Sequence, residues 1–451
     1  MIFNRVLVLC LAAAILTGCQ SETISSGSTR CPDRLARDER MEWFRDARYG
    51  MFVHYGPFSQ WYDWYVSKTL PNKAPEGATP EQRKRWYVAG LTPQRDFARH
   101  LARTAKAAGM KYIVFTTKHH EGFVLWDTKL TEFNSMNMGP GFDMVAEYVK
   151  ACREEGLKIG FYYSLWDFNH PDGIASKHDD ASRRRFLDYT QGLLRELMTN
   201  YGKIDILWYD GPSPLGYGGE WEAQKMNAMV RRLQPGIIIN DRSLTAEDFT
   251  CSEGHISATL HPDSDWEACM PFHHKLWTWY PADYKNYYTP RDIVDMFRQI
   301  VAGTGNLLMN VGPNPATGHI GNVELERLAV VGKWLEAHGE AIYGHVDRPE
   351  ALGFITNDAG GFWTRKGNTA YLWLPKWPGG GKIVLENVHG KLLSASIVTN
   401  GAKLGIDRAP QADTETVKNA SRVTLTGLPK KCPDAVCNYA ILKIQFETYP
   451  R

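Results

Sequence analysis

Short apolar runs alternate with longer amphipathic segments from residue 41 to about residue 345. The runs are rich in β-branched and aromatic residues, which is typical of buried β-strands. They are 49–55, 112–117, 159–165, 204–209, 236–240, 249–253, 276–280 and 306–311. The clearest amphipathic segments, each followed by a glycine or ending close to one, are 93–108, 142–155, 181–201 and 322–338. The pattern predicts eight strands, most of them followed by a helix.

Alternating strands and helices favour parallel βα units with right-handed crossovers. In a segment of this length, such units close most economically into a (β/α)8 TIM-type barrel, which we place at 40–345. A doubly wound open sheet is the alternative, with less support because no glycine-rich phosphate loop follows the first run. After residue 343 the chain changes to short alternating runs separated by Gly, Pro, Asn and Lys. These runs predict a small antiparallel β-sandwich over 350–451.

The N-terminus has the pattern of an export signal. Arg5 precedes an apolar run, 6–15, that is too short to cross a bilayer as a helix. Leu-Thr-Gly and Cys19 follow, and they resemble the lipobox of bacterial lipoproteins; an ordinary cleaved signal peptide is the alternative. We expect a signal peptide at 1–18, a lipid on Cys19 and a polar tether at 19–39. The protein would then be exported and lipid-anchored, in the bacterial periplasm or on the cell surface.

Composition narrows the class of partner. Lys and Arg number 52 against 50 Asp and Glu, and no basic stripe stands out, which argues against a nucleic-acid partner. The aromatic share of 12% suits the apolar faces of sugars, although Trp and Tyr also fill cores. The eight cysteines form no CxxC pair, so a structural zinc site is not expected. In an exported protein, Cys432 and Cys437 are the most plausible local disulfide.

The ends of the predicted strands carry most of the reactive side chains, and catalytic residues of a TIM-type barrel lie at that face. In chain order they include His54, His119, His120, Tyr163, Asp210, Arg242 and Glu253. Cleavage of a glycosidic bond with retention needs one ionised carboxylate and one carboxylic acid, about 5–5.5 Å apart. Asp210 is the best nucleophile, because it ends a buried run and Gly211 permits a sharp turn beside it. An Asx turn or a helix cap is the structural alternative for this residue.

A metal site and a serine or cysteine nucleophile have little support. His119 and His120 are adjacent, so they should point to opposite faces unless the strand is bulged, and they are not expected to chelate an ion together. No HExxH spacing and no GxSxG elbow occurs. The histidines are better suited to binding hydroxyl groups.

Seven segments spread over 40–345 together resemble the α-L-fucosidases of glycoside hydrolase family 29. They are RYGMFVHYGPFS, TTKHHEGFVLWDTKLTEFN, GFYYSLWDFNHP, DILWYDGP, NDR, GTGNLLMNVGPNPATG and VGKWLEAHGEAIYG. The resemblance implies hydrolysis of terminal α-L-fucosyl residues from glycans, by double displacement and without a metal or organic cofactor. It also implies a fucosylated oligosaccharide or glycoconjugate as the substrate.

The resemblance implies a role for each matching residue. Asp210 is the expected nucleophile, and the expected substrate-binding residues are His54, His119, His120, Tyr163, Trp208 and Arg242. The chain departs from the family pattern at Asp63-Trp64-Tyr65, where a Glu is usual in place of Asp63, and at Trp277-Thr278-Trp279-Tyr280, where Trp-Gly-Tyr is usual. We expect Asp63, Trp64 and Trp279 to contact the sugar, and these departures to affect substrate preference more than chemistry.

Three carboxylates compete for the role of the acid/base. Glu253 ends the segment DFTCSE (248–253), which resembles the family segment in which a Glu follows Phe-x-Thr, so it is the first choice. Glu267 also matches a family segment and is the runner-up, while Glu247 is third and is expected to be a solvated loop residue. Two other functions stay open: an α-L-galactosidase-like hydrolase of a fucose-related sugar, and a non-catalytic fucose-binding lipoprotein.

Overall fold

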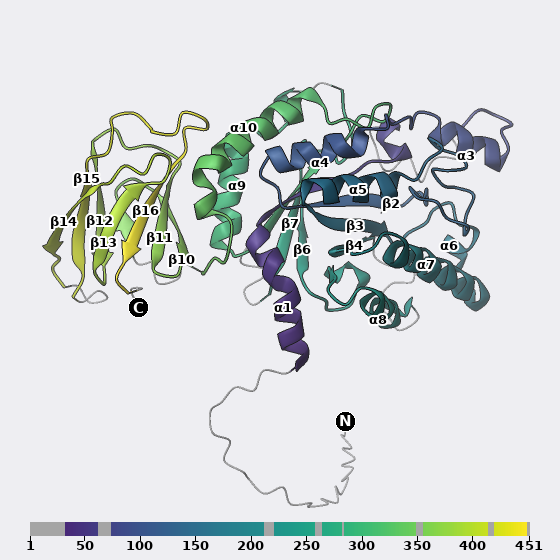
Figure 1. The fold of residues 1–451 in the computed structure, drawn as a ribbon, viewed down its shortest axis with the longest axis horizontal. Coiled ribbons are helices and arrows are strands. Elements are labelled where there is room, and N and C mark those ends of the chain that lie inside the picture. Colours follow the sequence, from purple (N-terminus) through teal and green to yellow (C-terminus); the bar gives the residue numbers. More distant parts are fainter. Residues whose placement is uncertain are drawn as a thin grey trace, which may run out of the picture.

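A barrel-like α/β region and a C-terminal region of antiparallel strands make up the protein (Figure 1). The computed structural model describes residues 32–61, 74–211, 221–257, 264–281, 284–348, 355–413 and 419–448. The predicted signal peptide and Cys19 lie outside these residues, and so do Asp63 and Trp64. None of the described helices is long and apolar enough to cross a membrane.

Eight parallel strands form one curled sheet. In the order in which they pair, they are β5 (Ile238–Ile239), β4 (Ile206–Asp210), β3 (Lys158–Ser164), β2 (Tyr112–Lys118), β1 (Tyr49–Val53), β8 (Asn306–Val311), β7 (Trp266–Pro271) and β6 (Thr250–Glu253). The edges β5 and β6 meet through an isolated bridge between Asn240 and Phe249. Beside it, the amide of Asp248 donates to the carbonyl of Ile239 over 2.9 Å. The predicted TIM-type barrel is confirmed, and its seam between β5 and β6 is short.

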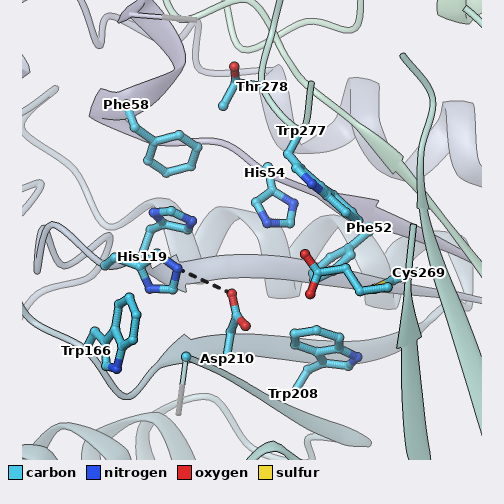
Figure 2. A pocket seen from close by; sticks show the side chains of 13 residues that line it. Phe52, His54, Phe58, His119, Trp166, Trp208, Asp210, Cys269, Trp277 and Thr278 are labelled. Atoms are coloured by element: carbon cyan, nitrogen blue, oxygen red, sulfur yellow. Dashed lines mark ion pairs between the residues drawn. The ribbon is translucent and has the colours of Figure 1, made fainter. Parts of the chain in front are cut away.

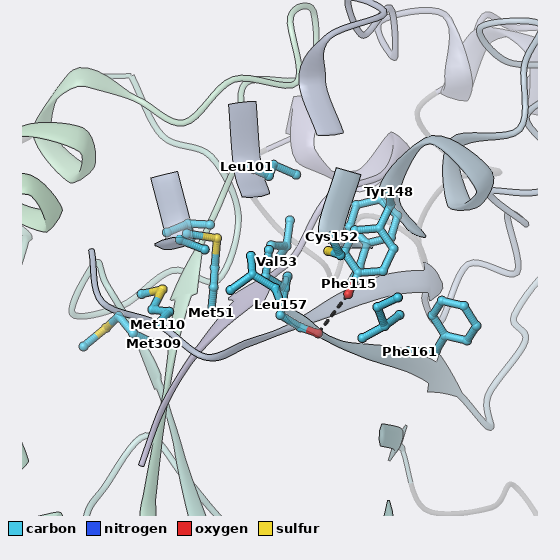
Figure 3. Close-up of a cluster of buried hydrophobic side chains, with 14 of the residues drawn as sticks. Met51, Val53, Leu101, Met110, Phe115, Tyr148, Cys152, Leu157, Phe161 and Met309 are labelled. Carbon is cyan, nitrogen blue, oxygen red and sulfur yellow. Dashed lines mark hydrogen bonds between the residues drawn. The ribbon is translucent and has the colours of Figure 1, made fainter. Parts of the chain in front are cut away.

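Helices cover the outside of the sheet (Figure 1). They are α3 (Pro80–Val88), α4 (Phe97–Ala107), α5 (Met144–Glu155), α6 (Pro171–Ala175), α7 (Asp180–Asn200), α8 (Ala223–Leu233), α9 (Pro290–Ala302) and α10 (Asn322–His338). The four predicted helices are confirmed as α4, α5, α7 and α10. Figure 3 shows part of the apolar layer beneath them, where Met51 and Phe115 of the sheet lie near Leu101 of α4 and Tyr148 of α5. Burial of this layer holds the strand ends in place.

Helix α1 (Pro32–Ala47) closes the amino-terminal end of the barrel. The ring of Phe44 packs on that of Phe249 with centroids 4.8 Å apart, and Arg40 pairs with the buried Asp248 at 2.6 Å. The predicted tether is therefore wrong for residues 32–39, which are helical. The tether was predicted from the polar stretch before them, in which Ser, Thr and Gly are prominent, whereas Arg37 of the helix pairs with Asp265 at 3.0 Å.

Strand β7 also differs from the prediction, which placed a strand at 276–280. The strand is Trp266–Pro271, and 276–280 lies in the connection that follows it. The sequence of β7 (WEACMP) has no β-branched residue and carries a glutamate at its second position, so it lacks the usual strand pattern.

The C-terminal region confirms the predicted β-sandwich. One sheet contains β10 (Phe362–Lys366), β11 (Thr369–Leu374), β16 (Ala440–Phe446) and β13 (Leu392–Ile397), and the other β14 (Gly405–Pro410), β15 (Ser421–Thr426), β12 (Lys382–Val388) and β9 (Thr356–Asn357). Helices α9 and α10 lie between this region and the barrel (Figure 1), and Nε1 of Trp334 donates to the carbonyl of Tyr439 over 3.1 Å. The predicted disulfide is wrong: Cys432 and Cys437 are both free thiols. The turn between them is held by Asp434, which accepts from the amides of Cys437 and Tyr439.

Candidate active site

A cavity of about 180 Å³ opens at the carboxyl ends of the barrel strands (Figure 2). The described residues that line it are Phe52, His54, Phe58, His119, His120, Trp166, Trp208, Asp210, Gly211, Glu253, Cys269, Trp277 and Thr278. The cavity combines aromatic walls with imidazoles and two carboxylates. Most of the predicted strand-end residues therefore lie together.

Asp210 is the last residue of β4, and its side chain faces the cavity (Figure 2). Its Oδ2 accepts a hydrogen bond from the hydroxyl of Tyr162 over 2.7 Å, and its Oδ1 accepts one from Nη1 of Arg242 over 2.9 Å. Gly211 follows with a φ of 69°, a left-handed conformation that glycine adopts without strain. The turn leaves the carboxylate at the open end of the strand.

Opposing effects decide the charge of Asp210. Burial by itself raises the pKa of a carboxyl group. The attraction of His120 and Arg242 works against burial, and hydrogen bonds from Tyr162 and from the amide of Gly211 add to it. Together these contacts hold the pKa of Asp210 well below its usual range. Because burial also lowers the pKa of His120 well below its usual value, that imidazole is neutral at pH 7 and Arg242 is the lasting cation. Asp210 is therefore ionised, as a nucleophile must be.

The cavity histidines are neutral hydrogen-bonding groups. Burial lowers the pKa of His54 to about 3, and that of His119 to about 3. Nδ1 of His54 lies 2.6 Å from the carboxamide oxygen of Asn310, whose nitrogen donates to the carbonyl of Trp277. Because that second contact fixes the orientation of the carboxamide, Nδ1 is the donor and Nε2 of His54 is an acceptor. Such an imidazole accepts a hydrogen bond from a hydroxyl without bringing charge into the cavity.

Arg242 connects Asp210 with Glu253. One terminal nitrogen of its guanidinium donates to Asp210, and the other donates to Oε2 of Glu253 over 2.6 Å. The side chain of Glu253 is 49% exposed, whereas that of Asp210 is 17% exposed. Of the two carboxylates that line the cavity, Asp210 is therefore the more enclosed and Glu253 the more open to solvent.

Glu267, the alternative acid/base, does not line the cavity. It lies in the middle of β7 with no exposed surface, and it accepts hydrogen bonds from Tyr112 over 2.5 Å and from Nε1 of Trp208 over 3.0 Å. This position contradicts the assignment of Glu267 as the acid/base, because both of its carboxylate oxygens accept hydrogen bonds inside the barrel.

Glu247, the third candidate, is not a solvated loop residue. Its Oε2 accepts from Arg231 of α8 over 2.6 Å, and its Oε1 accepts from Asn227 over 2.7 Å. It is not among the residues that line the cavity. These contacts make Glu247 part of the packing between α8 and the barrel.

The tyrosine of β3 that reaches the cavity side is Tyr162, and the prediction of Tyr163 is wrong. Tyr162 packs inside the barrel, where its ring stacks on that of Trp208 with centroids 5.8 Å apart. Tyr163 belongs to the apolar layer between the sheet and the helices. Successive residues of a strand point to opposite faces, so only one of the two can reach Asp210.

His119 and His120 both line the cavity, although they are adjacent. The register of β2 against β3 shifts between Thr116 and Lys118, so strict alternation is lost. The prediction that the two histidines point to opposite faces is therefore wrong. With Asp210 they place three ligand atoms within 4.8 Å of one another, which is compact enough for a metal ion. An ion bound there would cover the nucleophile and compete with a sugar.

Aromatic side chains shape the rest of the cavity. The predicted Trp208 lines it, and the guanidinium of Arg242 lies 4.9 Å from the centre of the Trp208 ring. Trp279 does not line it, whereas its neighbour Trp277 does. Phe58 packs against His119 with ring centroids 4.3 Å apart and was not predicted. The course of the loops after β1 and β7 decides which rings face the cavity, and periodicity carries no signal for it.

Comparisons with known proteins agree with this geometry. Residues 16–340 match the family model described as Alpha-L-fucosidase. The chain is 32% identical over 368 residues to the plasma α-L-fucosidase of Homo sapiens, covering 76% of this chain and 78% of the relative. It is 30% identical over 391 residues to an α-L-fucosidase of Branchiostoma floridae, covering 78% and 83%.

Solved structures give the same result. One is the α-L-fucosidase isoenzyme 1 from Paenibacillus thiaminolyticus, with a TM-score of 0.77, 31% identity, and coverage of 91% of this chain and 100% of the other. Another is a covalent intermediate trapped in a family 29 α-L-fucosidase from Bacteroides thetaiotaomicron, with a TM-score of 0.75, 27% identity, and coverage of 90% and 96%. This chain therefore belongs to the α-L-fucosidase family of glycoside hydrolases, family 29.

Proposed function

We propose that this protein is a retaining exo-α-L-fucosidase in which Asp210 is the nucleophile and Glu253 the acid/base. The observation that carries the proposal is the guanidinium of Arg242, which donates to both carboxylates at one cavity. The relatives and neighbours are named as α-L-fucosidases, and one of them was trapped as a covalent intermediate. Family membership supports the substrate, and the geometry supports the division of roles.

The first step forms an ester. The ionised Asp210 attacks the anomeric carbon of the fucosyl residue, while Glu253 gives its proton to the departing oxygen. Once the ester forms, Asp210 has lost its charge, and Glu253 is the remaining carboxylate partner of Arg242. Glu253, which lost its proton in the first step, then takes a proton from water as the water attacks the anomeric carbon and frees Asp210.

Recognition of the sugar is assigned to the cavity lining. Neutral His54, His119 and His120 exchange hydrogen bonds with its hydroxyl groups, and Trp277 and Phe58 pack against its apolar surface. The small, partly enclosed cavity suits one terminal sugar ring, which supports exo-cleavage of a fucosylated oligosaccharide or glycoconjugate.

The comparisons offer no support for the two alternatives, an α-L-galactosidase-like enzyme and a non-catalytic binding protein. One assay separates all three functions. We expect nitrophenol to be released from nitrophenyl α-L-fucoside much faster than from the α-L-galactosyl analogue, which carries one more hydroxyl on C6. Faster release from the galactosyl substrate would favour the first alternative, and binding without release from either would favour the second.

The location of the enzyme is part of the same proposal. The lipobox-like Leu-Thr-Gly before Cys19 supports export and a lipid anchor, with the active site held outside the cytoplasm. A periplasmic or surface position would bring the enzyme to glycans that reach the cell from outside.

A further inference from the structure

A second and larger cavity, of about 540 Å³, lies on the same face of the barrel. The described residues that line it are Ala78, Pro80, Arg83, Lys84, Tyr87, Phe133, Phe168, Asn169, His170 and Pro171. They come from the connections that follow β1, β2 and β3. Connections of this kind form the functional face of a TIM-type barrel, so the second cavity opens beside the first.

One side chain separates the two cavities. The ring of Phe168 lies 5.9 Å from that of His120 and 5.4 Å from that of Trp166, and both of these residues line the catalytic cavity. The amide of Phe168 also donates to the carbonyl of His120 over 2.9 Å. Phe168 therefore lines the second cavity and contacts two residues that line the first.

Two cationic side chains are among the described residues that line the second cavity. Arg83 and Lys84 of α3 line it, and no carboxylate is among the described residues that do. The ammonium of Lys84 lies 5.0 Å from the centre of the Phe133 ring, and it forms no ion pair with a carboxylate in the described part of the chain. A cation placed in this way is available to an anionic ligand.

Uncharged polar groups complete the lining. The hydroxyl of Tyr87 is fully buried and has no hydrogen-bond partner among the described residues. Nδ1 of His170 accepts from the amide of Asp172 over 3.1 Å, which leaves the proton of the neutral ring on Nε2 as a donor. The carboxamide nitrogen of Asn169 donates to the carbonyl of Glu121 over 2.7 Å, so its oxygen is an acceptor. Of these three groups, the Nε2 proton of His170 and the carboxamide oxygen of Asn169 are available to a ligand, because the hydroxyl of Tyr87 is enclosed.

We infer that this cavity binds an anionic sugar unit, one that carries a sulfate ester or a carboxylate. Lys84 and Arg83 would face the anionic group, and Asn169 and His170 would bind hydroxyls. The half-buried ring of Phe168 offers a flat apolar face of the kind on which sugars pack. The inference goes beyond the proposed function, because it assigns a second saccharide site.

Binding to the full-length protein tests the inference, followed by NMR titration in the presence of saturating L-fucose, which fills the catalytic cavity. The probes are galactose 6-sulfate, galacturonate, neutral galactose and inorganic sulfate. We expect the two anionic sugars to bind about tenfold more tightly than galactose, because a charge-assisted hydrogen bond adds to the sugar contacts. Inorganic sulfate should bind more weakly than galactose 6-sulfate, because it lacks the ring.

Three variants localise the binding. Lys84→Met keeps the apolar stem against Phe133 and removes the charge. It should therefore reduce the affinity of both anionic sugars about tenfold and leave the affinity of galactose unchanged. His170→Phe should reduce the affinity of all three sugars, because it removes the Nε2 donor and keeps a ring in the lining. Lys129→Met is the matched control: its side chain is 91% exposed and outside the cavity, so all affinities should stay as in the wild type.

Several results would overturn the inference. They are no binding of either anionic sugar, displacement of both by L-fucose, equal affinity of inorganic sulfate (an adventitious ion only), and unchanged affinities in Lys84→Met. Binding of only one anionic sugar would support the site and identify its anionic group. Because the readout is binding and not turnover, failure here leaves the proposed fucosidase activity untouched.

Discussion

The indole nitrogen of Trp208 donates a hydrogen bond to Oε1 of Glu267 over 3.0 Å, inside the barrel and beneath the catalytic cavity. The guanidinium of Arg242 lies over the ring of Trp208. It donates hydrogen bonds to both candidate carboxylates, Asp210 and Glu253. Glu267 therefore supports the position of Trp208 beneath the proposed catalytic groups, and it does not line the cavity.

Glu267 should make the protein less stable as pH rises from about 5 to about 7. Burial raises the pKa of Glu267 to about 7 from the 4.5 of a free carboxyl group, against hydrogen bonds from Tyr112 and Trp208. Between these two values the folded state binds the proton and the unfolded state does not, so the free energy of unfolding falls with rising pH. Glu267→Gln does not titrate there and should lose less stability than the wild type. Urea unfolding at pH 5 and pH 7.5 measures this, and identical pH slopes would contradict it.

Tyr162→Phe should reduce activity, whereas Tyr163→Phe should not. Loss of the Tyr162 hydroxyl removes a hydrogen bond to Asp210, so kcat/KM should fall roughly ten- to a hundredfold. The pKa of Asp210 should rise, which moves the acidic limb of the kcat/KM profile to higher pH. Tyr163→Phe changes a side chain outside the cavity and should keep the wild-type profile. Equal losses in both variants would argue against a direct role of Tyr162.

Asp210→Ala should fold normally and lose turnover by roughly a thousandfold or more, because the covalent intermediate cannot form. Azide fills the space of the missing carboxylate and should restore part of the turnover on an aryl fucoside. The product should be a fucosyl azide of inverted configuration, identified by NMR. Turnover close to that of the wild type without azide would remove Asp210 from the nucleophile's role.

Glu253→Ala should selectively slow the cleavage of substrates that have a poor leaving group. A sugar alcohol needs a proton to depart, whereas nitrophenol leaves readily as an anion, so hydrolysis of fucosyl-oligosaccharides should fall far more than formation of the fucosyl-enzyme from an aryl fucoside. Azide should give a fucosyl azide of retained configuration. The control Glu267→Gln should slow the reaction of both substrates by a similar factor, since Glu267 acts through Trp208. If the two variants exchanged these patterns, the acid/base assignment would be wrong and the nucleophile would stand.

Cys19→Ser should change where the protein is found. If Cys19 carries a lipid, the wild type should need detergent for extraction from membranes, and the variant should be released or stall in processing. Fractionation followed by immunoblotting measures this. A wild-type protein that is fully soluble in the medium would rule out the anchor.

The order of strands and helices and the residues at the strand ends could be predicted from the sequence, because both depend on local periodicity. Asp210, His54 and Arg242 follow apolar runs, and parallel strands bring their carboxyl ends to one face whatever the details of packing. Helix α1 and strand β7 were missed, because the first has a linker's composition and the second lacks β-branched residues. In both cases a contact with the rest of the barrel stabilises a segment whose local pattern is weak.

The division of roles within the cavity depended on the tertiary structure. Tyr162 and Tyr163 are the same residue type on one strand, so only the way β3 faces the barrel interior decides which of them meets Asp210. Glu253 and Glu267 both match family segments, yet one ends a strand at the cavity mouth and the other is enclosed in the barrel. The sequence by itself determined the family and the chemistry, because these depend on which groups are present. Only the tertiary structure decided which of these groups lie together at the cavity, because that depends on distance, direction and burial, which residues far apart in the chain create for one another.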